Sequence, residues 1–523
     1  MSVIKDFQER IDSFLIELLN SLSFPSEIQT KIIHDSVWGT NRFHPWEIGL
    51  IDSPLLQRLR RIHQTGLAFL VFPTATHTRF EHSLGVTVKV EDFVNHLNIN
   101  KKNTFIGETE KYNLRLSALL HDIGHSFFSH ISELIYNRMS VFQDLKSEIN
   151  HIYGVKPKGH EILSFLMVKS KIFQEYFNSM TRFCIIHNRK EFHNKYLKNI
   201  DWDLIAGWII GYSKDPGKKY LSEIINGPID CDKLDYLARD AKFAGPVIVY
   251  DIDRLLYTLT TVRIGKSEQL TVTLGGITAL EQILISRMMM FSYIYHHHKV
   301  RAAEAMIKRL CFDIINEKLF VKRKSVNIIL EHPVDFLKYS DEVILNSYSE
   351  LFNISTNSKL VIKNLLNRKL WHRGMIVSEF NIENDELDRN YVNLEVDLHL
   401  KTEQQYLRDI KDKIINEVRK IDPSAKIEHR DIWIDVPKPP SDKEAKELKI
   451  KRSHTSNENP LPLLDVFPLA DWIEAYKAFK LRSHIFCWKE HQKIIYSACK
   501  NVLLDTFNLK VLDFTSNLCK IDI

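Results

Sequence analysis

Cysteine is scarce in this chain and scattered along it. The six cysteines among the 523 residues form no CxxC pair and no framework of short spacings. This absence excludes a zinc ribbon and a disulfide scaffold. A chain without closely spaced thiols fits a reducing compartment, so we expect a cytoplasmic protein.

Long apolar runs and a strong excess of one charge are also missing. No apolar run reaches the roughly 18 residues of a membrane span, and acidic residues interrupt the N-terminal apolar residues, so we expect neither a membrane span nor a signal peptide. The 71 Lys and Arg against 66 Asp and Glu leave a net charge of +5, far below the excess of a protein dedicated to coating nucleic acid. What remains is a globular chain with room for several domains.

Most of the chain has the apolar spacing of helices. Between residues 55 and 310, apolar residues recur at intervals of three and four with little strict alternation. The run 277–310 is long enough for a single helix, and one amphipathic helix is expected within residues 1–30. Two more helices are expected at 469–480 and 491–507. We therefore predict a mainly α fold.

The character of the sequence changes after about residue 370. Residues 391–400 and 426–436 alternate apolar and polar side chains, which is typical of strands, and a helical stretch at 403–419 separates them. Five prolines around a lysine-rich run predict an exposed loop at 437–462. The predicted domains are an N-terminal helical extension (1–30), a helical catalytic domain (31–330) and a smaller C-terminal α+β lobe (331–523).

Histidine is the most informative residue type in this sequence. The chain has 23 histidines, and several of them lie beside acidic residues. Four groups stand out: HTRFEHSLG at 77–85, HDIGHSFFSH at 121–130, KGHE at 158–161 and DCDKLDYLARD at 230–240. Imidazole nitrogen and carboxylate oxygen suit a borderline divalent ion or non-haem iron, whereas the lack of paired thiolates argues against structural zinc. The four groups together predict a catalytic metal site.

The adjacent pair His121 and Asp122 can complete such a site only with ligands from other segments. His82 and Asp232, from the first and last groups, are the candidates. His125 lies four residues after His121, so on a continuous helix it shares that face and can contact phosphate beside the metal. A single His-Asp pair, or one buried histidine, is more often structural than a ligand, and the prediction therefore depends on the groups acting together.

The last group also forms a helical stripe. Asp232, Tyr236 and Asp240 recur at i, i+4 and i+8, so one acid can bind the metal while the tyrosine and the second acid face a substrate. The triplet 296–298 (HHH) looks like a metal cluster, but consecutive helical residues fan out by about 100° and cannot converge on one ion. We expect that triplet to serve packing and a polar face.

Three segments carry a resemblance to a known family. QRLRRIHQTGLAFLVFPTATHTRFEHSLGV, LLHDIGHSFFSH and DCDKLDYLARDAKFAG resemble the HD-domain deoxynucleoside triphosphate triphosphohydrolases, a group of the HD-domain metallo-phosphohydrolases. The likeness runs from about residue 30 to 310, and the α+β lobe resembles the C-terminal part of these enzymes. It implies an HD-type helical core. It also implies an enzyme that cleaves either dGTP or several different dNTPs to deoxynucleoside and inorganic triphosphate. We expect no counterpart of the sterile-alpha-motif domain that some members carry.

The resemblance also implies roles for particular residues. The metal ligands fall on His82, His121, Asp122 and Asp232, for Fe, Mn, Zn or Ni, with Mg accompanying the nucleotide. Residues around the scissile phosphate fall on His125, His130, Glu133 and His160, where Glu133 replaces the Asp of animal members. Triphosphate, sugar and base fall on Arg79, Lys233, Tyr236, Asp240, Arg287 and Tyr295. Among the catalytic residues, we favour His130 as proton donor, His125 as a phosphate contact, and His160 with Glu133 for ordering water.

Regulation is the last property that the resemblance implies. A guanine-activator site resembles Lys31, Asp35, Asp52, Gln57, Arg60 and Arg254. We therefore expect dGTP or GTP to activate a homodimer or homotetramer, with a dNTP as substrate and no membrane partner. Alternatively, Asp52, Gln57 and Arg60 only cap and brace a helix.

Two other functions stay open at this point. One is an HD-type nuclease or phosphodiesterase that binds single-stranded nucleic acid through the loop 437–462 and scattered lysines. The other is a non-enzymatic nucleotide sensor that uses Asp52, Gln57 and Arg60. Intact metal ligands count against the sensor.

Overall fold

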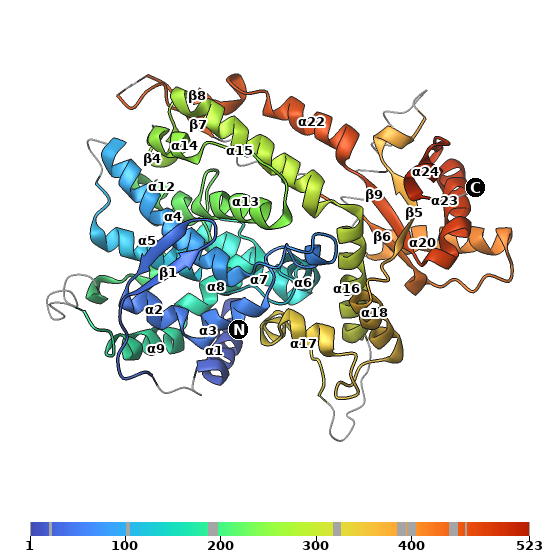
Figure 1. Cartoon of the computed structure of the whole chain (residues 1–523), viewed down its shortest axis with the longest axis horizontal. Coiled ribbons are helices and arrows are strands. Elements are labelled where there is room, and N and C mark those ends of the chain that lie inside the picture. The colour runs from blue at the N-terminus through green and yellow to red at the C-terminus, as the bar shows by residue number, and fades with distance from the viewer. Residues whose placement is uncertain are drawn as a thin grey trace. The chain divides into compact units, whose positions relative to one another are not determined.

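The computed structural model describes residues 2–19, 24–100, 105–186, 197–316, 326–383, 394, 404–438, 448–455 and 458–521 (Figure 1). The chain divides into two compact units that interleave along the sequence. The first comprises residues 1–287, 318–353 and 443–467, and the second comprises 288–317, 354–442 and 468–523. The sequence-based domain boundaries stay a prediction beside this division.

The first unit is mainly helical. Its helices are α1 (Val3–Leu19), α2 (Pro45–Ile51), α3 (Pro54–Gln57), α4 (Arg79–Asn100), α5 (Glu108–Leu120), α6 (His130–Tyr136), α7 (Ser140–Tyr153), α8 (Gly159–Lys169), α9 (Lys171–Thr181), α11 (Trp202–Ile209), α12 (Lys219–Ile225), α13 (Cys231–Ala244), α14 (Ile252–Thr258), most of α15 (Ile277–Met290) and α17 (Asp341–Asn346). Three antiparallel pairs accompany them: β1 (Lys31–Asp35) with β2 (Gly39–Phe43), β3 (Leu259–Ile264) with β4 (Ser267–Val272), and β7 (Lys449–Ile450) with β8 (Leu461–Pro462).

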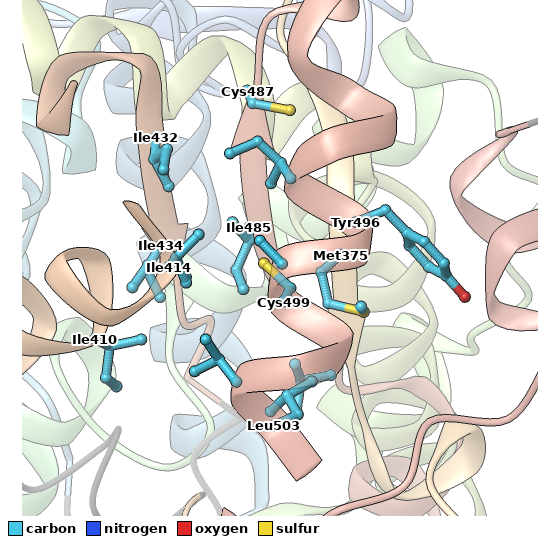
Figure 2. Packing of buried hydrophobic residues seen from close by; sticks show 14 of the residues in the cluster. Met375, Ile410, Ile414, Ile432, Ile434, Ile485, Cys487, Tyr496, Cys499 and Leu503 are labelled. Atoms are coloured by element: carbon cyan, nitrogen blue, oxygen red, sulfur yellow. The ribbon is translucent and has the colours of Figure 1, made fainter. Parts of the chain in front are cut away.

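The second unit joins helices to a small sheet. Its helices are α16 (His298–Asn316), α18 (Thr356–Leu366), α20 (Gln404–Ile421), α22 (Leu469–Lys480), α23 (Gln492–Phe507) and α24 (Thr515–Cys519). Strands β5 (His372–Val377), β9 (Ser483–Cys487) and β6 (Ile432–Asp435) form an antiparallel sheet in that order. Figure 2 shows Met375, Ile485 and Cys499 gathered between α23 and the sheet in the core of this unit. The predicted fold class, mainly α with a smaller α+β lobe, is confirmed.

Some local predictions were wrong. The run 277–310 is not one helix, because α15 gives way to a π-helical turn at Phe291–Tyr295 before α16 begins at His298. His296 is therefore outside both α-helices, and its Nδ1 lies 3.0 Å from the Tyr476 hydroxyl. The β3–β4 hairpin interrupts a region predicted to be helical. The prediction missed it because strands of six residues are too short to show a clear period in the sequence.

Other predictions are tested only in part. The strand expected at 426–436 shortens to β6 (Ile432–Asp435), and almost all of the strand expected at 391–400 lies outside the described residues. The loop at 437–462 is described only in part. Each of the six cysteines is buried as a free thiol. No helix formed by the described residues has the length and apolar character needed to cross a membrane.

Helices α4, α5 and α13 form the framework of the first unit, with α4 packed against both others. Gly85 on α4 permits the approach of α13, because a Cβ at this position would collide with Asp235 Oδ1 and Arg239 Nη2. The buried face of α4 includes Leu84, Val86, Val90, Phe93, Val94 and Leu97. The two helices are thus in close contact at Gly85.

A buried ion pair ties α5 to α2 in the same unit. Arg115 Nε donates to Glu47 Oε1 at 2.6 Å and Arg115 Nη2 donates to Glu47 Oε2 at 2.9 Å. Burial disfavours the charged carboxylate, but the paired guanidinium outweighs it and lowers the pKa of Glu47. The pair therefore stays ionised within the core.

We predict that Arg115→Met destabilises the protein by about 3–5 kcal/mol, because it leaves the Glu47 charge buried without its partner. Chemical denaturation of the variant measures this loss. Lys218→Met is the matched control, since Lys218 pairs with Glu110 at the surface and its loss should cost about 1 kcal/mol or less. Equal stability of the two variants would contradict a buried charge at Glu47.

Candidate metal centre and active site

Four predicted metal ligands converge from three segments of the first unit. His82 lies on α4, His121 and Asp122 follow the end of α5, and Asp232 lies in the first turn of α13. His82 Nε2 is 3.1 Å from Asp232 Oδ1 and 3.6 Å from Asp122 Oδ2. His121 Nε2 is 3.3 Å from Asp122 Oδ1. Residues separated by up to 150 positions in the sequence thus surround one small volume.

The donor atoms fit a metal ion. In the part of the chain that the structure describes, the buried Nε2 atoms of His82 and His121 have no hydrogen-bond partner. The Nδ1–H of His121 donates to the Ala118 carbonyl at 2.7 Å, so its Nε2 carries a lone pair. Ligand atoms of His82, His121 and Asp122 lie within 4.8 Å of one another. Asp232 approaches His82 from the side that is partly open to solvent.

The charges around this volume favour a cation. Burial opposes the charged form of His82, yet its contacts with Asp232 and Asp235 prevail and raise the pKa of His82 to about 10. Burial also disfavours the ionised carboxylates, but His121 and Arg79 hold the pKa of Asp122 below its ordinary value. Contact with His82 has the same effect on the pKa of Asp232. The carboxylates are therefore negative and available as ligands.

The His-Asp dipeptide is not helical, which corrects one step of the sequence argument. Helix α5 ends at Leu120, and residues 121–124 form a turn. The expectation that His125 shares a helical face with His121 was therefore wrong. His125 still reaches the site, because its Nε2 lies 3.4 Å from Asp122 Oδ1.

Packing holds this turn in place. A Cβ at Gly124 would collide with the backbone of α8 at His160 and Ser164, so only glycine allows the turn to lie there. Arg58 donates to the carbonyls of Ile123 and His125. The sequence did not single out Arg58, since nothing local links it to a turn more than 60 residues away.

A second cluster lies beside the metal ligands. It consists of His125, His130, Glu133 and His160, whose ligand-type atoms also lie within 4.8 Å of one another. Glu133 Oε2 is 3.0 Å from Nδ1 of both His130 and His160, and Oε1 accepts from the Gly159 backbone N–H at 2.6 Å. Burial disfavours charge on Glu133, but the two imidazoles outweigh it and hold its pKa well below the ordinary value. One carboxylate thus orients both imidazoles.

The imidazoles differ in surroundings. His125 is buried and stacks on His160 with ring centroids 3.8 Å apart, and burial together with Arg79 lowers the pKa of His125 well below its ordinary value. The side chain of His130 is more than half exposed. His130 is therefore the member of the cluster that solvent reaches.

An unusual backbone conformation introduces His130. Phe128 and Ser129 have positive φ angles of 51° and 52°, which non-glycine residues seldom adopt. Asp341 accepts from the Phe128 backbone N–H at 2.6 Å, and Arg79 Nε donates to Ser129 Oγ at 2.9 Å. This turn sets where α6 begins and so where His130 and Glu133 point.

Of the predicted substrate residues, Arg79 and Asp240 are buried, whereas Lys233 pairs with Asp230 at the start of α13. Arg79 is buried and donates to Asp122 Oδ2 at 2.9 Å, and Asp240 is buried with Oδ1 2.7 Å from His77 Nε2. These two brace the site. Lys233 Nζ donates to Asp230 Oδ2 at 2.7 Å while lying in the first turn of α13.

Tyr236 lies one turn after Asp232 on α13 and is partly exposed. Burial raises the pKa of its hydroxyl, and Arg287 opposes that shift, which indicates that the guanidinium of Arg287 is near. Tyr295 belongs to the second unit, so its role at this site stays a prediction.

The predicted activator residues form surface pairs and one buried link. Lys31 Nζ donates to Asp52 Oδ2 at 2.6 Å, and Arg60 Nε donates to Gln57 Oε1 at 2.9 Å. Arg254 donates to the Gly275 carbonyl at 3.1 Å. Asp35 instead turns inward, with Oδ2 2.9 Å from Arg239 Nη1. The structure thus separates Asp35 from the surface set.

Asp235 is another residue to which the sequence argument assigned no role. It lies within the quoted motif of α13, is fully buried, and accepts from His82 Nδ1 at 2.7 Å. Its spacing of i+3 from Asp232 places it near the same helical face, and this spacing could have indicated a partner for a ligand. A carboxylate that holds the far nitrogen of a metal-binding histidine is common in metal sites.

Comparison with known proteins agrees with this geometry. The HD domain matches residues 79–240, which contain all four candidate ligands, and the HD associated region matches residues 250–510. The chain therefore belongs to the HD-domain family.

Several relatives are similar over much of the chain. A deoxynucleoside triphosphate triphosphohydrolase SAMHD1 homolog of Dictyostelium discoideum is 26% identical over 372 residues, covering 70% of this chain and 64% of the relative. An uncharacterized protein of Methanocaldococcus jannaschii is 31% identical over 332 residues, covering 62% of this chain and 60% of the relative. Human deoxynucleoside triphosphate triphosphohydrolase SAMHD1 is 30% identical over 230 residues, covering 43% of this chain and 35% of the relative. The chain thus spans less than two thirds of the length of these three.

A solved structure shares the fold. The crystal structure of a hypothetical protein from Aquifex aeolicus superposes with a TM-score of 0.59 at 24% identity, covering 90% of this chain and all of that one. This likeness supports the fold and carries no argument about activity.

Proposed function

We propose that this protein is a metal-dependent dNTP triphosphohydrolase that converts a dNTP to deoxynucleoside and inorganic triphosphate. The observation that carries the proposal is the convergence of His82, His121, Asp122 and Asp232 beside the imidazole cluster around Glu133. The similarity to proteins described as dNTP triphosphohydrolases supports a dNTP as the substrate.

His82, His121, Asp122 and Asp232 would hold the metal. Their nitrogen and oxygen donors suit Fe, Mn, Zn or Ni, and Mg would accompany the nucleotide. A divalent ion at this position supplies positive charge that polarises a phosphoryl oxygen and lowers the pKa of water.

The imidazole cluster would move the protons. The exposed His130 donates a proton to the sugar oxygen that leaves, and the buried, neutral His125 contacts phosphate. His160, oriented by Glu133, orders the attacking water. Glu133 supports this division because it keeps the Nδ1 atoms of both imidazoles engaged and directs each Nε2 away from itself.

Tyr236 would discriminate against ribonucleotides. By the family resemblance, this ring would lie beside the sugar, where a 2′-hydroxyl would lose water without gaining a partner. We expect GTP to be hydrolysed about tenfold to a hundredfold more slowly than dGTP, as a penalty of roughly 1–3 kcal/mol implies. Initial rates with both nucleotides measure the ratio, and equal rates would remove this role from Tyr236.

An activating dGTP or GTP would bind to Lys31, Asp52, Gln57, Arg60 and Arg254 in a homodimer or homotetramer. We also propose that the protein is cytoplasmic. Sedimentation with and without nucleotide tests the assembly. An active monomer that is indifferent to dGTP and GTP would leave the Lys31–Asp52 and Gln57–Arg60 pairs as surface bracing only.

Chromatography of the products is the decisive experiment for the function. The protein is incubated with each dNTP, and separately with a labelled single-stranded oligonucleotide. We expect free deoxynucleoside and triphosphate from dNTPs at rates that added DNA does not change. Shortening of the oligonucleotide without dNTP cleavage would instead identify a nuclease, and tight nucleotide binding without products would identify a sensor.

A further inference from the structure

A chain of hydrogen bonds runs from the β1–β2 turn to the candidate metal ligand His82. Trp38, in that turn, donates from Nε1–H to Asp235 Oδ1 at 2.5 Å. Asp235 Oδ2 accepts from His82 Nδ1 at 2.7 Å. Asp235 and His82 are fully buried, so water does not compete for either bond.

A second route joins the same turn to the same carboxylate. Arg239 donates to Asp235 through Nε and Nη2, both at 2.9 Å. Its remaining terminal nitrogen, Nη1, lies 2.9 Å from Asp35 Oδ2. Asp35 Oδ1 in turn accepts from the backbone N–H groups of Val37 and Trp38 at 2.7 and 2.8 Å. Asp35 therefore shapes the turn and holds Arg239 at once.

These contacts fix the tautomer of His82. Among the described residues, the side chains that hydrogen-bond to the Asp235 carboxylate are donors: Trp38, Arg239 and His82. Since Asp235 accepts at Nδ1, the proton of a neutral His82 lies there and Nε2 presents its lone pair toward Asp122 and Asp232. The absence of a Cβ at Gly85 leaves the room that Asp235 and Arg239 occupy.

We propose that the β1–β2 turn positions the metal ligand His82, with Trp38 and Asp35 acting as positioning residues through Asp235 and Arg239. The proposal rests on the metal centre of the proposed function and extends it to a surface element more than 40 residues earlier in the chain. It assigns a role to a tryptophan that the sequence did not single out.

Trp38→Phe tests the proposal most cleanly. The variant keeps an aromatic ring under the Lys89 ammonium, which lies 3.7 Å from the Trp38 ring centroid, but loses the N–H donor. The probe is Co²⁺ alone, titrated without nucleotide and followed by its visible absorption. We expect Co²⁺ to bind about tenfold more weakly with a changed spectrum, as loss of outer partners commonly causes. Trp202→Phe is the matched control. In the described part of the chain, the Trp202 ring packs against the rings of Phe173 and Phe177. This variant should bind Co²⁺ as the parent protein does.

Asp235→Asn provides an independent second variant. An amide NH₂ at the Oδ1 position would face the N–H groups of both Trp38 and Arg239. The amide is therefore expected to turn so that its NH₂ faces His82 Nδ1, because the imidazole can shift its proton whereas Trp38 and Arg239 cannot. The proton then moves to Nε2 of His82, where it blocks the metal. We expect Co²⁺ affinity to fall by about 10- to 100-fold, while thermal unfolding monitors whether the chain remains folded.

The outcomes separate this proposal from the function itself. Folded Trp38→Phe and Asp235→Asn proteins that bind Co²⁺ with the parent's affinity and spectrum would overturn the positioning role, whatever the product analysis shows. Weaker Co²⁺ binding in both variants, with the Trp202→Phe control unchanged, supports it even if no dNTP is cleaved. In that last case, the proposed substrate is wrong and the metal centre stands.

Discussion

Asp232→Asn is expected to lower both the metal content of the protein and its turnover of dNTP, the latter by about 10²-fold or more. Asp232 supplies a carboxylate 3.1 Å from His82 Nε2 and is the proposed ligand on the partly open side of the site. An amide is a neutral and weaker ligand for a divalent ion than a carboxylate. The variant should keep the fold, because the N-cap of α13 is Asp230 and not Asp232.

Metal analysis of the purified protein and product chromatography provide the two readouts. Asp203→Asn is the matched control, since Asp203 pairs with Lys169 at the surface and should leave both quantities unchanged. An Asp232→Asn protein with full metal occupancy and full activity would exclude Asp232 from the ligand set.

Glu133→Gln is expected to reduce turnover by about 10²-fold while leaving the metal in place. Glu133 Oε2 accepts from Nδ1 of both His130 and His160, and Oε1 accepts from the Gly159 N–H. A glutamine can satisfy only one side. Either its NH₂ faces the imidazoles and reverses their tautomers, or it faces the buried Gly159 N–H. Loss of proton transfer by a positioned imidazole commonly costs about 10²–10⁴ in rate.

The control for this substitution is Glu161→Gln on α8, the helix that carries His160. Glu161 accepts from the Lys158 backbone N–H at 2.7 Å in a capping box, where glutamine is an accepted substitute. We expect normal turnover from the control. Loss of metal from Glu133→Gln would instead assign Glu133 to the metal centre, and unchanged turnover would remove it from catalysis.

Local sequence patterns were sufficient for the elements with long, regular spacing. Helices α22 (Leu469–Lys480) and α23 (Gln492–Phe507) begin and end within one residue of the predicted limits. Their apolar spacing repeats over several turns, which is enough to establish the helical period. The hairpin β3–β4 and the break between α15 and α16 were missed, because short strands and a single π turn carry too few residues to establish a period.

Chemistry also came from the sequence by itself. The residue types His82, His121, Asp122 and Asp232 specified imidazole and carboxylate ligands, since the donor atoms of a side chain do not depend on the fold. The sequence likewise set the order of the four histidine and acid groups, on which the family resemblance depends.

Only the tertiary structure decided which side chains meet. Asp235 touches His82 from 153 positions away, and Trp38 touches Asp235 from 197 positions away. Periodicity describes a side chain relative to its own helix axis, whereas these contacts depend on how closely two elements approach, as Gly85 permits for α4 and α13. The candidate ligands could therefore be identified from the sequence. The contacts that hold them in place could not, because these arise from packing between segments that carry no local signal for one another.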